Sequence, residues 1–472
     1  MNIKNFLLAD ESTAIMRTAQ RQTHVYIIGQ PGVGKSRFIE SWFMQDVLNG
    51  NGAGIIDPHG DLFNHLVARI AMHPEIWERI IVLDPCNPKW AVPINPLSAF
   101  NGESATRNAW FLSDVILKIW SLKMTDAPRM SWLMGNSFAA LAELKLPLTH
   151  LPRFLLDVDF RDRQIGRLEN YETRSYFEHE FPKTASGVRQ WAAPLLNKMG
   201  ELLYDSDIRC LLNSQYGLDF RKVMDGNQIL LVNIPKGILG ENTSALLGAF
   251  LVAQMQKAAL ARANSSKRYP FYLYLDEFQN YTTDNIKDIL SESRKYALAL
   301  IIANQYLSQL NPDIREAVLN TAGSLVSFRI GYNDATKLSR HIFPSADYLC
   351  RKRMALHLTG SGMIPGIRFK QESMDESWEV CTQALSGLPM RNFWMRSRSN
   401  QKPARYRSLD MPDPKLTSEV RSRISDLVEM SGSRYARLKS EIREREDRSG
   451  FSRGEYRSNQ NSDSDHPPLW NT

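Results

Sequence analysis

The most constraining feature of this sequence is a glycine-rich octapeptide between an apolar stretch and a helical pattern. Residues 24–29, HVYIIG, have the composition of a buried strand, and an amphipathic helix is expected from about Lys35 to Leu48. The octapeptide GQPGVGKS joins them and consists of Gly29, Gln30, Pro31, Gly32, Val33, Gly34, Lys35 and Ser36. The spacing GxxxxGK[ST] between a strand and a helix is typical of a phosphate-binding P-loop.

Each part of this loop has a chemical role in binding phosphate. Glycines permit a tight turn whose backbone N–H groups face phosphate oxygens, and the N-terminus of the following helix adds partial positive charge. Lys35 is expected to reach the β- and γ-phosphates, and Ser36 is expected to bind Mg²⁺. The sequence therefore predicts a site for ATP and Mg²⁺ at residues 29–36.

A P-loop also needs an acidic group on another strand to organise the metal ion. The apolar run YLYL at 272–275 ends in Asp276 and Glu277. Asp276 is expected to hold Mg²⁺ through water, and Glu277 is expected to polarise the attacking water as a general base. Capping of a following helix by Asp276 is compatible with this role.

Two other apolar runs end in polar side chains. The motif DPHGDL begins at Asp57, where Asp57 or His59 is expected to face a nucleotide or nucleic acid. Capping of the next helix by Asp61 is the alternative for this motif, and the residues do not decide between them. The run IIANQ ends in Gln305, which is expected to sense the γ-phosphate or to position water, with a locally bonded loop amide as the alternative.

A cation is also expected at the edge of the site. Arg294 lies just before the apolar run 298–303, and an arginine at a subunit boundary can complete a neighbour's site and stabilise transition-state charge. Arg315 and Arg329 are rival candidates, and a solvated surface role is the alternative for each of the three.

The order of strand and helix patterns predicts an α/β fold with a mainly parallel sheet covered on both faces. We expect a first part of the core at 1–103, an all-helical insertion at 104–225, a second part of the core at 226–395 and a basic tail at 396–472. A charged helix is predicted within the tail at 420–448, and disorder is predicted from Ser449. The expected strands are 24–29, 54–57, 80–83, 228–234, 271–276, 298–303 and 324–330, with a hairpin at 354–358 and 366–370.

Composition restricts the partners and the compartment. Lys and Arg number 58 against 51 Asp and Glu, so the net charge of +7 permits a polyanionic partner without requiring one. The four cysteines form no CxxC pair, which argues against a zinc ribbon or disulfide framework and favours reduced thiols in the cytoplasm. The sequence has no signal peptide and no apolar run of about 18 residues, so no transmembrane segment is predicted.

Together these motifs resemble the HerA/FtsK superfamily of ring-forming DNA-pumping ATPases, and most of all the TraG/TraD type of conjugative coupling protein. The likeness covers most of residues 20–340, and the helical insertion resembles the all-alpha domain of coupling proteins. Coupling proteins usually begin with transmembrane helices and HerA proteins with a small β-barrel, and neither pattern is seen here. The matching segments include HVYIIGQPGVGKS, GIIDPHGDL, FYLYLDEFQNY and ESRKYALALIIANQYLSQL.

The resemblance implies a RecA-like ATPase core that forms a homohexameric ring, hydrolyses ATP and moves DNA through a central channel. Arg294 matches the position of a finger arginine in HerA-like motors. A relaxase or secretion-channel proteins are implied as partners, which would place the cytoplasmic protein at the periphery of the inner membrane. The family's nucleotide-site positions fall on Lys35, Ser36, Asp276, Glu277 and Gln305.

Two other functions are compatible with the same residues. One is a DNA-packaging or defence-associated motor that works with a separate nuclease. The other is a nucleotide-dependent assembly switch that organises partner proteins and does little work on DNA. Stimulation of ATP turnover by DNA separates both motors from the switch.

Overall fold

The computed structural model describes most of the chain. The described residues are 21–98, 104–281, 285–349, 355–359, 362–366, 374–398 and 400–448. The disorder that the sequence predicts from Ser449 lies outside these residues.

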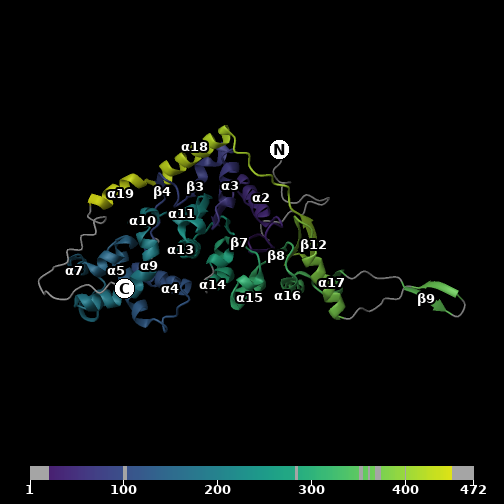
Figure 1. Cartoon of the computed structure of the whole chain (residues 1–472), viewed down its shortest axis with the longest axis horizontal. Coiled ribbons are helices and arrows are strands. Elements are labelled where there is room, and N and C mark those ends of the chain that lie inside the picture. The colour runs from purple at the N-terminus through teal and green to yellow at the C-terminus, as the bar shows by residue number, and fades with distance from the viewer. Residues whose placement is uncertain are drawn as a thin grey trace, which may run out of the picture.

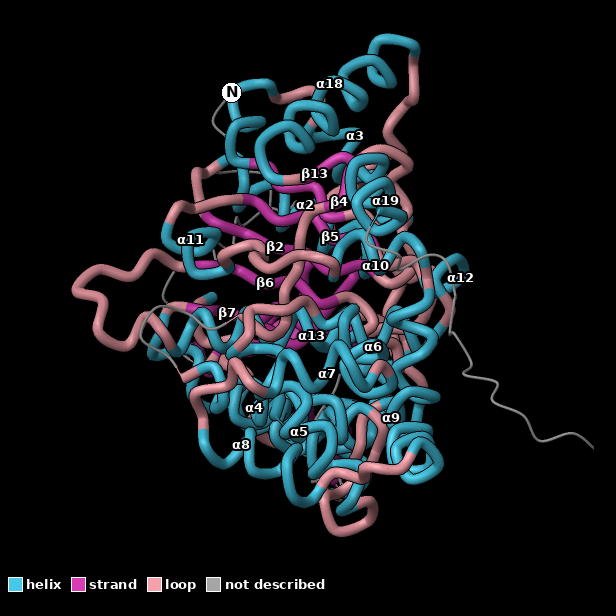
Figure 2. Tube along the Cα trace, turned by 90° about the vertical axis from the view of Figure 1, so that its left-hand side faces the viewer, coloured by secondary structure: helices cyan, strands magenta, loops and turns pink. Residues whose placement is uncertain are grey.

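The core is a nine-stranded sheet in the order β12-β11-β8-β1-β7-β6-β2-β5-β3 (Figure 2). The seven strands from β8 to β3 are parallel to one another, whereas β11 runs antiparallel to β8 and β12 antiparallel to β11. The strands are β1 Val25–Ile28, β2 Gly52–Asp57, β3 Ile80–Leu83, β5 Ile229–Asn233, β6 Phe271–Leu275, β7 Leu298–Asn304, β8 Ser324–Ser327, β11 Asn392–Ser397 and β12 Asn400–Arg407.

The seven predicted strands are confirmed as the parallel part of this sheet. The sheet continues past residue 395, where the sequence predicted the start of a tail, because β11 and β12 add two strands at one edge. In β11 only every second residue is fully buried. β12, with the sequence NQKPARYR, carries three basic residues and a proline, as edge strands often do. The basic composition of β12 gives little apolar signal. β11, with the sequence NFWMRS, has apolar residues but spans the predicted boundary between core and tail.

Both faces of the sheet are buried, which explains why its strands read as continuous apolar runs. Along β1, Tyr26 and Ile28 join the core on one face, and Val25 and Ile27 join the core on the other. The second of these cores is completed by α2 Lys35–Leu48, α3 Asp61–Ile70 and α18 Ser418–Tyr435. The first is completed by α13 Glu241–Leu260, α14 Asn285–Glu292, α15 Pro312–Thr321, α16 Tyr332–Ile342 and α17 Met374–Ser386.

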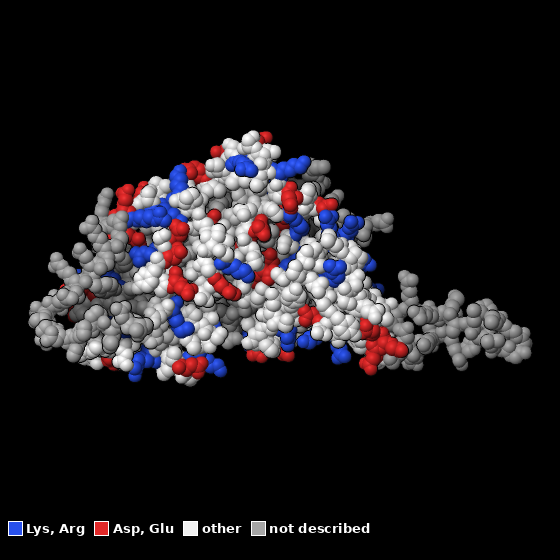
Figure 3. Space-filling view, viewed as in Figure 1, with Lys and Arg blue, Asp and Glu red and all other residues white. Residues whose placement is uncertain are grey.

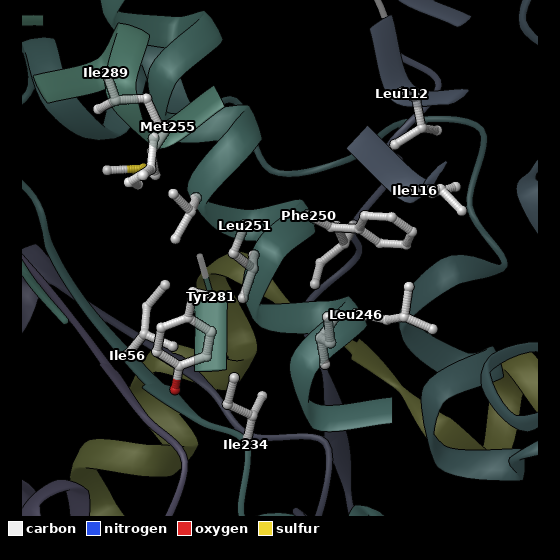
Figure 4. Close-up of a cluster of buried hydrophobic side chains, with 14 of the residues drawn as sticks. Ile56, Leu112, Ile116, Ile234, Leu246, Phe250, Leu251, Met255, Tyr281 and Ile289 are labelled. Atoms are coloured by element: carbon white, nitrogen blue, oxygen red, sulfur yellow. The ribbon is translucent and has the colours of Figure 1, made fainter. Parts of the chain in front are cut away.

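Residues 104–225 contain helices and loops and no strand, as predicted. Helix α13 lies between these helices and the sheet, and its Phe250 points toward Leu112 and Ile116 of α4 (Figure 4). Because α13 is buried on nearly every side, its apolar residues follow no single stripe. The helices of the insertion are α4 Ala105–Ile119, α5 Pro128–Glu143, α6 Leu151–Leu156, α7 Val158–Ile165, α8 Tyr171–Ser175, α9 Ala185–Tyr204, α10 Ser206–Leu212 and α11 Phe220–Asp225.

After β12 the chain forms a long strap, residues 408–448, that runs back over the molecule (Figure 1). The predicted charged helix is present as α18 and α19 Lys439–Arg448, separated by the short strand β13 Arg437–Leu438, which pairs with β4 Trp90–Ala91. Helix α18 packs against β3, and α19 packs against α10 of the helical insertion. The strap therefore contacts both the sheet and the insertion.

Ion pairs fasten the end of the strap to α10. The Nζ atom of Lys439, whose side chain is only 2% exposed, lies 2.7 Å from both the Pro85 carbonyl and the Asp207 carboxylate. Glu446 accepts hydrogen bonds from Arg209 at 3.0 Å and from Asn213 at 2.7 Å.

Two further sequence predictions can be compared with the structure. The expected hairpin is confirmed, although its second strand begins earlier than predicted: β9 Ala355–Thr359 pairs antiparallel with β10 Gly362–Gly366. Within the described residues, no helix combines the length and the apolar character needed to cross a membrane.

Candidate nucleotide-binding site

A cavity of about 420 Å³ opens at the carboxyl ends of β1, β2, β6 and β7. These strands are neighbours in the sheet, so the polar residues that follow each of them meet at one edge. The cavity is lined by Gln30, Pro31, Gly32, Gly34, Lys35, Ser36, Arg37, Glu40, Asp57, His59, Asp61, Leu62, His65, Asp276, Glu277 and Gln305. Of the predicted site residues, the structure brings all but Gly29, Val33 and Arg294 to this lining.

Local geometry shapes the glycine-rich loop. Gly34 adopts a left-handed conformation with φ of 103° and precedes α2, where no side chain caps the first N–H groups. Gly29 packs so closely that an added Cβ would lie 2.6 Å from the Cβ of Phe328. Val33 is buried in the core. Gly29 and Val33 therefore anchor the loop, while its other residues border the cavity.

The lysine of the loop meets the two adjacent carboxylates. Lys35 Nζ lies 3.1 Å from Oε1 of Glu277 and 3.5 Å from Oδ1 of Asp276, and all three side chains are buried. Glu277 has a φ of 47°, a left-handed backbone conformation that is uncommon for a residue with a side chain and that often occurs at functional sites. The turn after β6 thus presents both carboxylates to one cation.

The two carboxylates differ in acidity. Burial raises the pKa of Asp276 above its ordinary value, although Lys35 acts in the opposite direction. Burial also acts to raise the pKa of Glu277, but the charge of Lys35 and two side-chain amide hydrogen bonds outweigh it, so that this pKa is lowered. Glu277 is therefore the carboxylate that stays ionised more readily.

Two glutamines orient Glu277. The Nε2 group of Gln305 donates to Oε1 at 2.8 Å, and the Nε2 group of Gln279 donates to Oε2 at 2.7 Å. Sequence reasoning included Gln305 and missed Gln279. Its place two residues after Glu277, in the turn that follows β6, was the only available signal.

The motif DPHGDL is also placed at the cavity. Asp57 accepts hydrogen bonds from the backbone N–H groups of His59 at 2.9 Å and Phe63 at 2.8 Å. Asp57 therefore caps α3, whereas Asp61 is the first residue of that helix and Gly60 occupies the N-cap position. His59 is exposed at the mouth of the cavity. Capping is therefore provided by Asp57 and not by Asp61, and Asp57 and His59 both line the cavity, so that their role toward a nucleotide stays a prediction.

The side of the cavity between α2 and α3 contains residues that sequence reasoning missed. Glu40 is fully buried and pairs with Arg37 at 2.7 Å and with Arg69. Arg37 also pairs with Asp413 of the strap. No sequence motif connects these positions, because Asp413 meets Arg37 only through the path of the strap.

Arg294 does not line this cavity. It is an exposed residue of the 3₁₀ turn Ser293–Tyr296 before β7, whereas Gln305 follows the other end of β7. The strand has seven residues, so the two edges lie about 20 Å apart at roughly 3.3 Å per residue. Of the rivals, Arg315 is on α15, and the backbone carbonyl of Arg329 accepts a hydrogen bond from Gln30 N–H at 3.0 Å.

The oxygen ligands at the cavity fit Mg²⁺. This ion takes one or two carboxylates and keeps several waters or phosphate oxygens. The Asp276 carboxylate and the exposed Ser36 both line the cavity and supply such a set. Within the part of the chain that the structure describes, no cluster of three or more His, Cys, Asp or Glu side chains offers a metal site of another kind.

Comparison with known proteins gives structural neighbours. No family model and no curated protein matches the sequence. The unbound bacterial conjugative coupling protein TrwBΔN70 has a TM-score of 0.55 at 14% identity, and the match covers 88% of this chain and 91% of that chain. VirB4 of Thermoanaerobacter pseudethanolicus has a TM-score of 0.52 at 12% identity, with 86% of this chain and 96% of that chain covered.

TrwB has also been solved with a non-hydrolysable ATP analogue, a structure with a TM-score of 0.56 at 15% identity that covers 88% of this chain and 92% of that chain. Likeness at these identities establishes the fold. The nine-stranded, mainly parallel sheet and the P-loop at the end of β1 agree with it. The chain therefore has the fold of TrwB and VirB4, with the mainly parallel sheet and P-loop that its motifs predicted.

Proposed function

We propose that this protein is an ATPase that assembles into a ring and moves DNA, in conjugative transfer or the transfer of another mobile element. The observation that carries the proposal is the convergence of Lys35, Asp276, Glu277 and Gln305 on one cavity at the end of the parallel strands. The structural neighbours TrwB and VirB4 support a nucleotide-driven motor.

ATP and Mg²⁺ are the proposed ligands of the cavity. The free N–H groups at the start of α2 and the charge of Lys35 suit the β- and γ-phosphates. Ser36 and Asp276 would hold Mg²⁺, which when bound neutralises charge on the phosphate oxygens. Solved TrwB structures with an ATP analogue and with ADP and Mg²⁺ support this choice.

The acidity of Asp276 predicts a pH dependence. Protonation removes the carboxylate that would hold Mg²⁺, and the raised pKa of Asp276 brings this protonation to a higher pH than for an ordinary aspartate. We therefore expect Mg²⁺-dependent nucleotide affinity to weaken as the pH falls through that raised pKa. Titration of the affinity at several pH values would measure this. Asp276→Asn should bind weakly with a flatter profile, and identical profiles for the two proteins would contradict the assignment.

Hydrolysis is proposed to use Glu277 as the base. Its lowered pKa keeps it ionised, and the hydrogen bonds from Gln279 and Gln305 fix its orientation. In this arrangement Glu277 accepts a proton from the attacking water while Gln305 positions that water beside the γ-phosphate. Lys35, which faces both carboxylates, would turn to the phosphates when they enter.

The ring is proposed because the subunit's own site lacks the predicted arginine. Arg294 is at the opposite edge of the sheet and would act on a neighbouring subunit's nucleotide. The family resemblance points to six copies of the chain in the ring. A relaxase or secretion-channel proteins are the proposed further partners, and they would hold a cytoplasmic ring near the inner membrane.

DNA is the proposed substrate, and a direct test is available. On the face in Figure 3, basic and acidic side chains are interspersed and form no extended patch of one sign. DNA contacts of a ring motor are expected to come from phosphate-binding loops in its channel, with little sequence preference.

We expect single- or double-stranded DNA to raise the ATPase rate, and DNA affinity to fall steeply with salt because phosphate contacts release counterions. The measurement is ATP turnover with and without each DNA, together with binding at several salt concentrations. Lys35→Ala protein, prepared identically, reports any contaminating ATPase. An ATPase rate that DNA does not change, together with no DNA binding at any salt concentration, would favour the assembly switch.

A further inference from the structure

A second cavity, of about 590 Å³, lies at the amino ends of β1, β7 and β8, on the opposite edge of the sheet from the P-loop. We refer to it as the amino-edge cavity. None of its residues belongs to the candidate nucleotide site. It is lined by Thr23, His24, Leu290, Ser291, Arg294, Asn320, Thr321, Gly323, Ser397 and Arg398.

The hairpin between β11 and β12 contributes a second arginine to this cavity. The backbone N–H of Arg398 donates to the carbonyl of Gly323 at 2.8 Å, which holds the residue after β11 against the start of β8. A smaller cavity of about 200 Å³ shares Arg398 and Gly323 and adds Arg396, whose guanidinium donates to the carbonyl of His341. Arg398 therefore stands between two adjoining cavities.

The lining of the amino-edge cavity is positively charged. Arg294 and Arg398 are exposed to it, and no Asp or Glu occurs among the described residues that line it. His24 contributes no charge near neutral pH, because burial, together with the positive charge of Arg294, lowers its pKa to about 4. Asn320 adds a neutral amide donor, whereas the Thr321 hydroxyl donates to the Ala317 carbonyl at 2.5 Å. Guanidinium groups with an amide donor suit phosphate oxygens.

The nucleotide cavity has the opposite imbalance. The Lys and Arg side chains that line it are Lys35 and Arg37. Lys35 faces the two catalytic carboxylates, and Arg37 is paired with Glu40 and Asp413. Among the lining residues, no Lys or Arg without an acidic partner is therefore left to stabilise negative charge that develops on the outer side of a γ-phosphate. The amino-edge cavity, about 20 Å away, presents two arginines.

We infer that the amino-edge cavity is a phosphate-binding site for the nucleotide of a second copy of this chain, and that Arg398 binds that phosphate beside Arg294. The inference rests on the proposed ring ATPase and adds a residue to it. In a ring, the amino-edge cavity of one subunit, with its two arginines, would face the nucleotide cavity of the next subunit. Arg398 is then a phosphate-binding residue that acts only between subunits.

The first test compares three variants. Arg398→Ala should lower ATP turnover by about tenfold or more, since a lost donor to transition-state charge commonly has at least this effect. The KM for ATP should change little, because the P-loop of each subunit is intact. Arg398→Lys should recover part of the rate. Arg405→Ala is the control, because Arg405 is on the same hairpin, is exposed and donates only to Asn392 among the bonds found for its side chain. Wild-type turnover in Arg398→Ala would overturn the inference.

The second test is complementation. Mixed particles of Arg398→Ala and Lys35→Ala protein should recover part of the activity, because one subunit supplies an intact P-loop and the other supplies Arg398. Particles shown by mass to contain both proteins but lacking recovery would overturn the inference. Arg294→Ala mixed with Lys35→Ala tests the proposed ring separately. Recovery there without recovery for Arg398→Ala would reject only the role of Arg398.

A third measurement distinguishes nucleotide from DNA. One outcome is that Arg398→Ala keeps the wild-type ATPase rate without DNA, but that the slope of log affinity for DNA against log salt concentration falls by about one. The cavity would then bind a DNA phosphate, and the inference would be overturned. Thermal melting checks that each variant is folded. If Arg398→Ala does not fold, the same measurements are made on Arg398→Lys. Wild-type turnover and complementation in that variant, with an unchanged KM, would count against the inference.

Discussion

Lys35→Ala should abolish ATP turnover, with a loss on the order of a hundredfold or more. In the structure this lysine is the cation closest to both Asp276 and Glu277, at 3.5 and 3.1 Å. Removing it takes away the charge that would offset the β- and γ-phosphates and leaves two neighbouring carboxylates to repel the nucleotide. Steady-state phosphate release and nucleotide titration would measure turnover and affinity separately.

A matched control for this variant is Lys222→Ala. Lys222 is on α11, and its side chain is 86% exposed. It pairs with Asp219 and is not among the residues that line the candidate site. It should keep the parent's rate. Thermal melting is needed for Lys35→Ala as well, because the substitution leaves two buried carboxylates without their cation. A folded Lys35→Ala protein that hydrolysed ATP at the parent's rate would remove the P-loop from the proposed mechanism.

Glu277→Gln should separate binding from hydrolysis. The carboxamide has the size of the carboxylate and can still accept the hydrogen bond from Gln305. It cannot accept a proton from water, so turnover should fall by about 10²- to 10⁴-fold. ATP should still bind, because Asp276 and Lys35 are unchanged, and bound ATP should persist. Single-turnover measurements with separate determination of bound ATP and ADP would follow this.

Gln279→Ala is a useful comparison for Glu277→Gln. Gln279 donates to Oε2 of Glu277 at 2.7 Å and is not among the residues that line the cavity. Its loss should raise the pKa of Glu277 and shift the acid limb of the pH–rate profile upward, with a smaller effect on the maximal rate. Parent-like turnover in Glu277→Gln would mean that another residue accepts the proton.

The sheet and the nucleotide cavity were predictable because their signals are local. Each parallel strand is buried on both faces and so is a continuous apolar run, and the polar residues that follow β1, β6 and β7 mark the shared carboxyl edge. The sequence alone therefore predicts that Gly34, Lys35, Asp276 and Gln305 lie together. Their roles in catalysis stay predictions until the variants are measured.

Features that depend on distant contacts were not predictable. The edge strand β12 has basic residues where an inner strand has apolar ones, and Asp413 meets Arg37 only because the strap crosses α2. The capping role of Asp57 was missed for a different reason. Both Asp57 and Asp61 stand near the start of α3, and only the backbone geometry shows which carboxylate faces Phe63 N–H.

The strap has a consequence for the order in which the chain folds. Its anchors in the core and the insertion, among them Arg37, Val82, Pro85 and Asp207, all precede it in the sequence. During synthesis both units emerge first, and α18 and α19 can dock only onto surfaces that are already formed. A chain that stops before residue 418 would leave the α18-binding surface beside β3 uncovered. Docking of the strap therefore follows the synthesis of the surfaces that it covers.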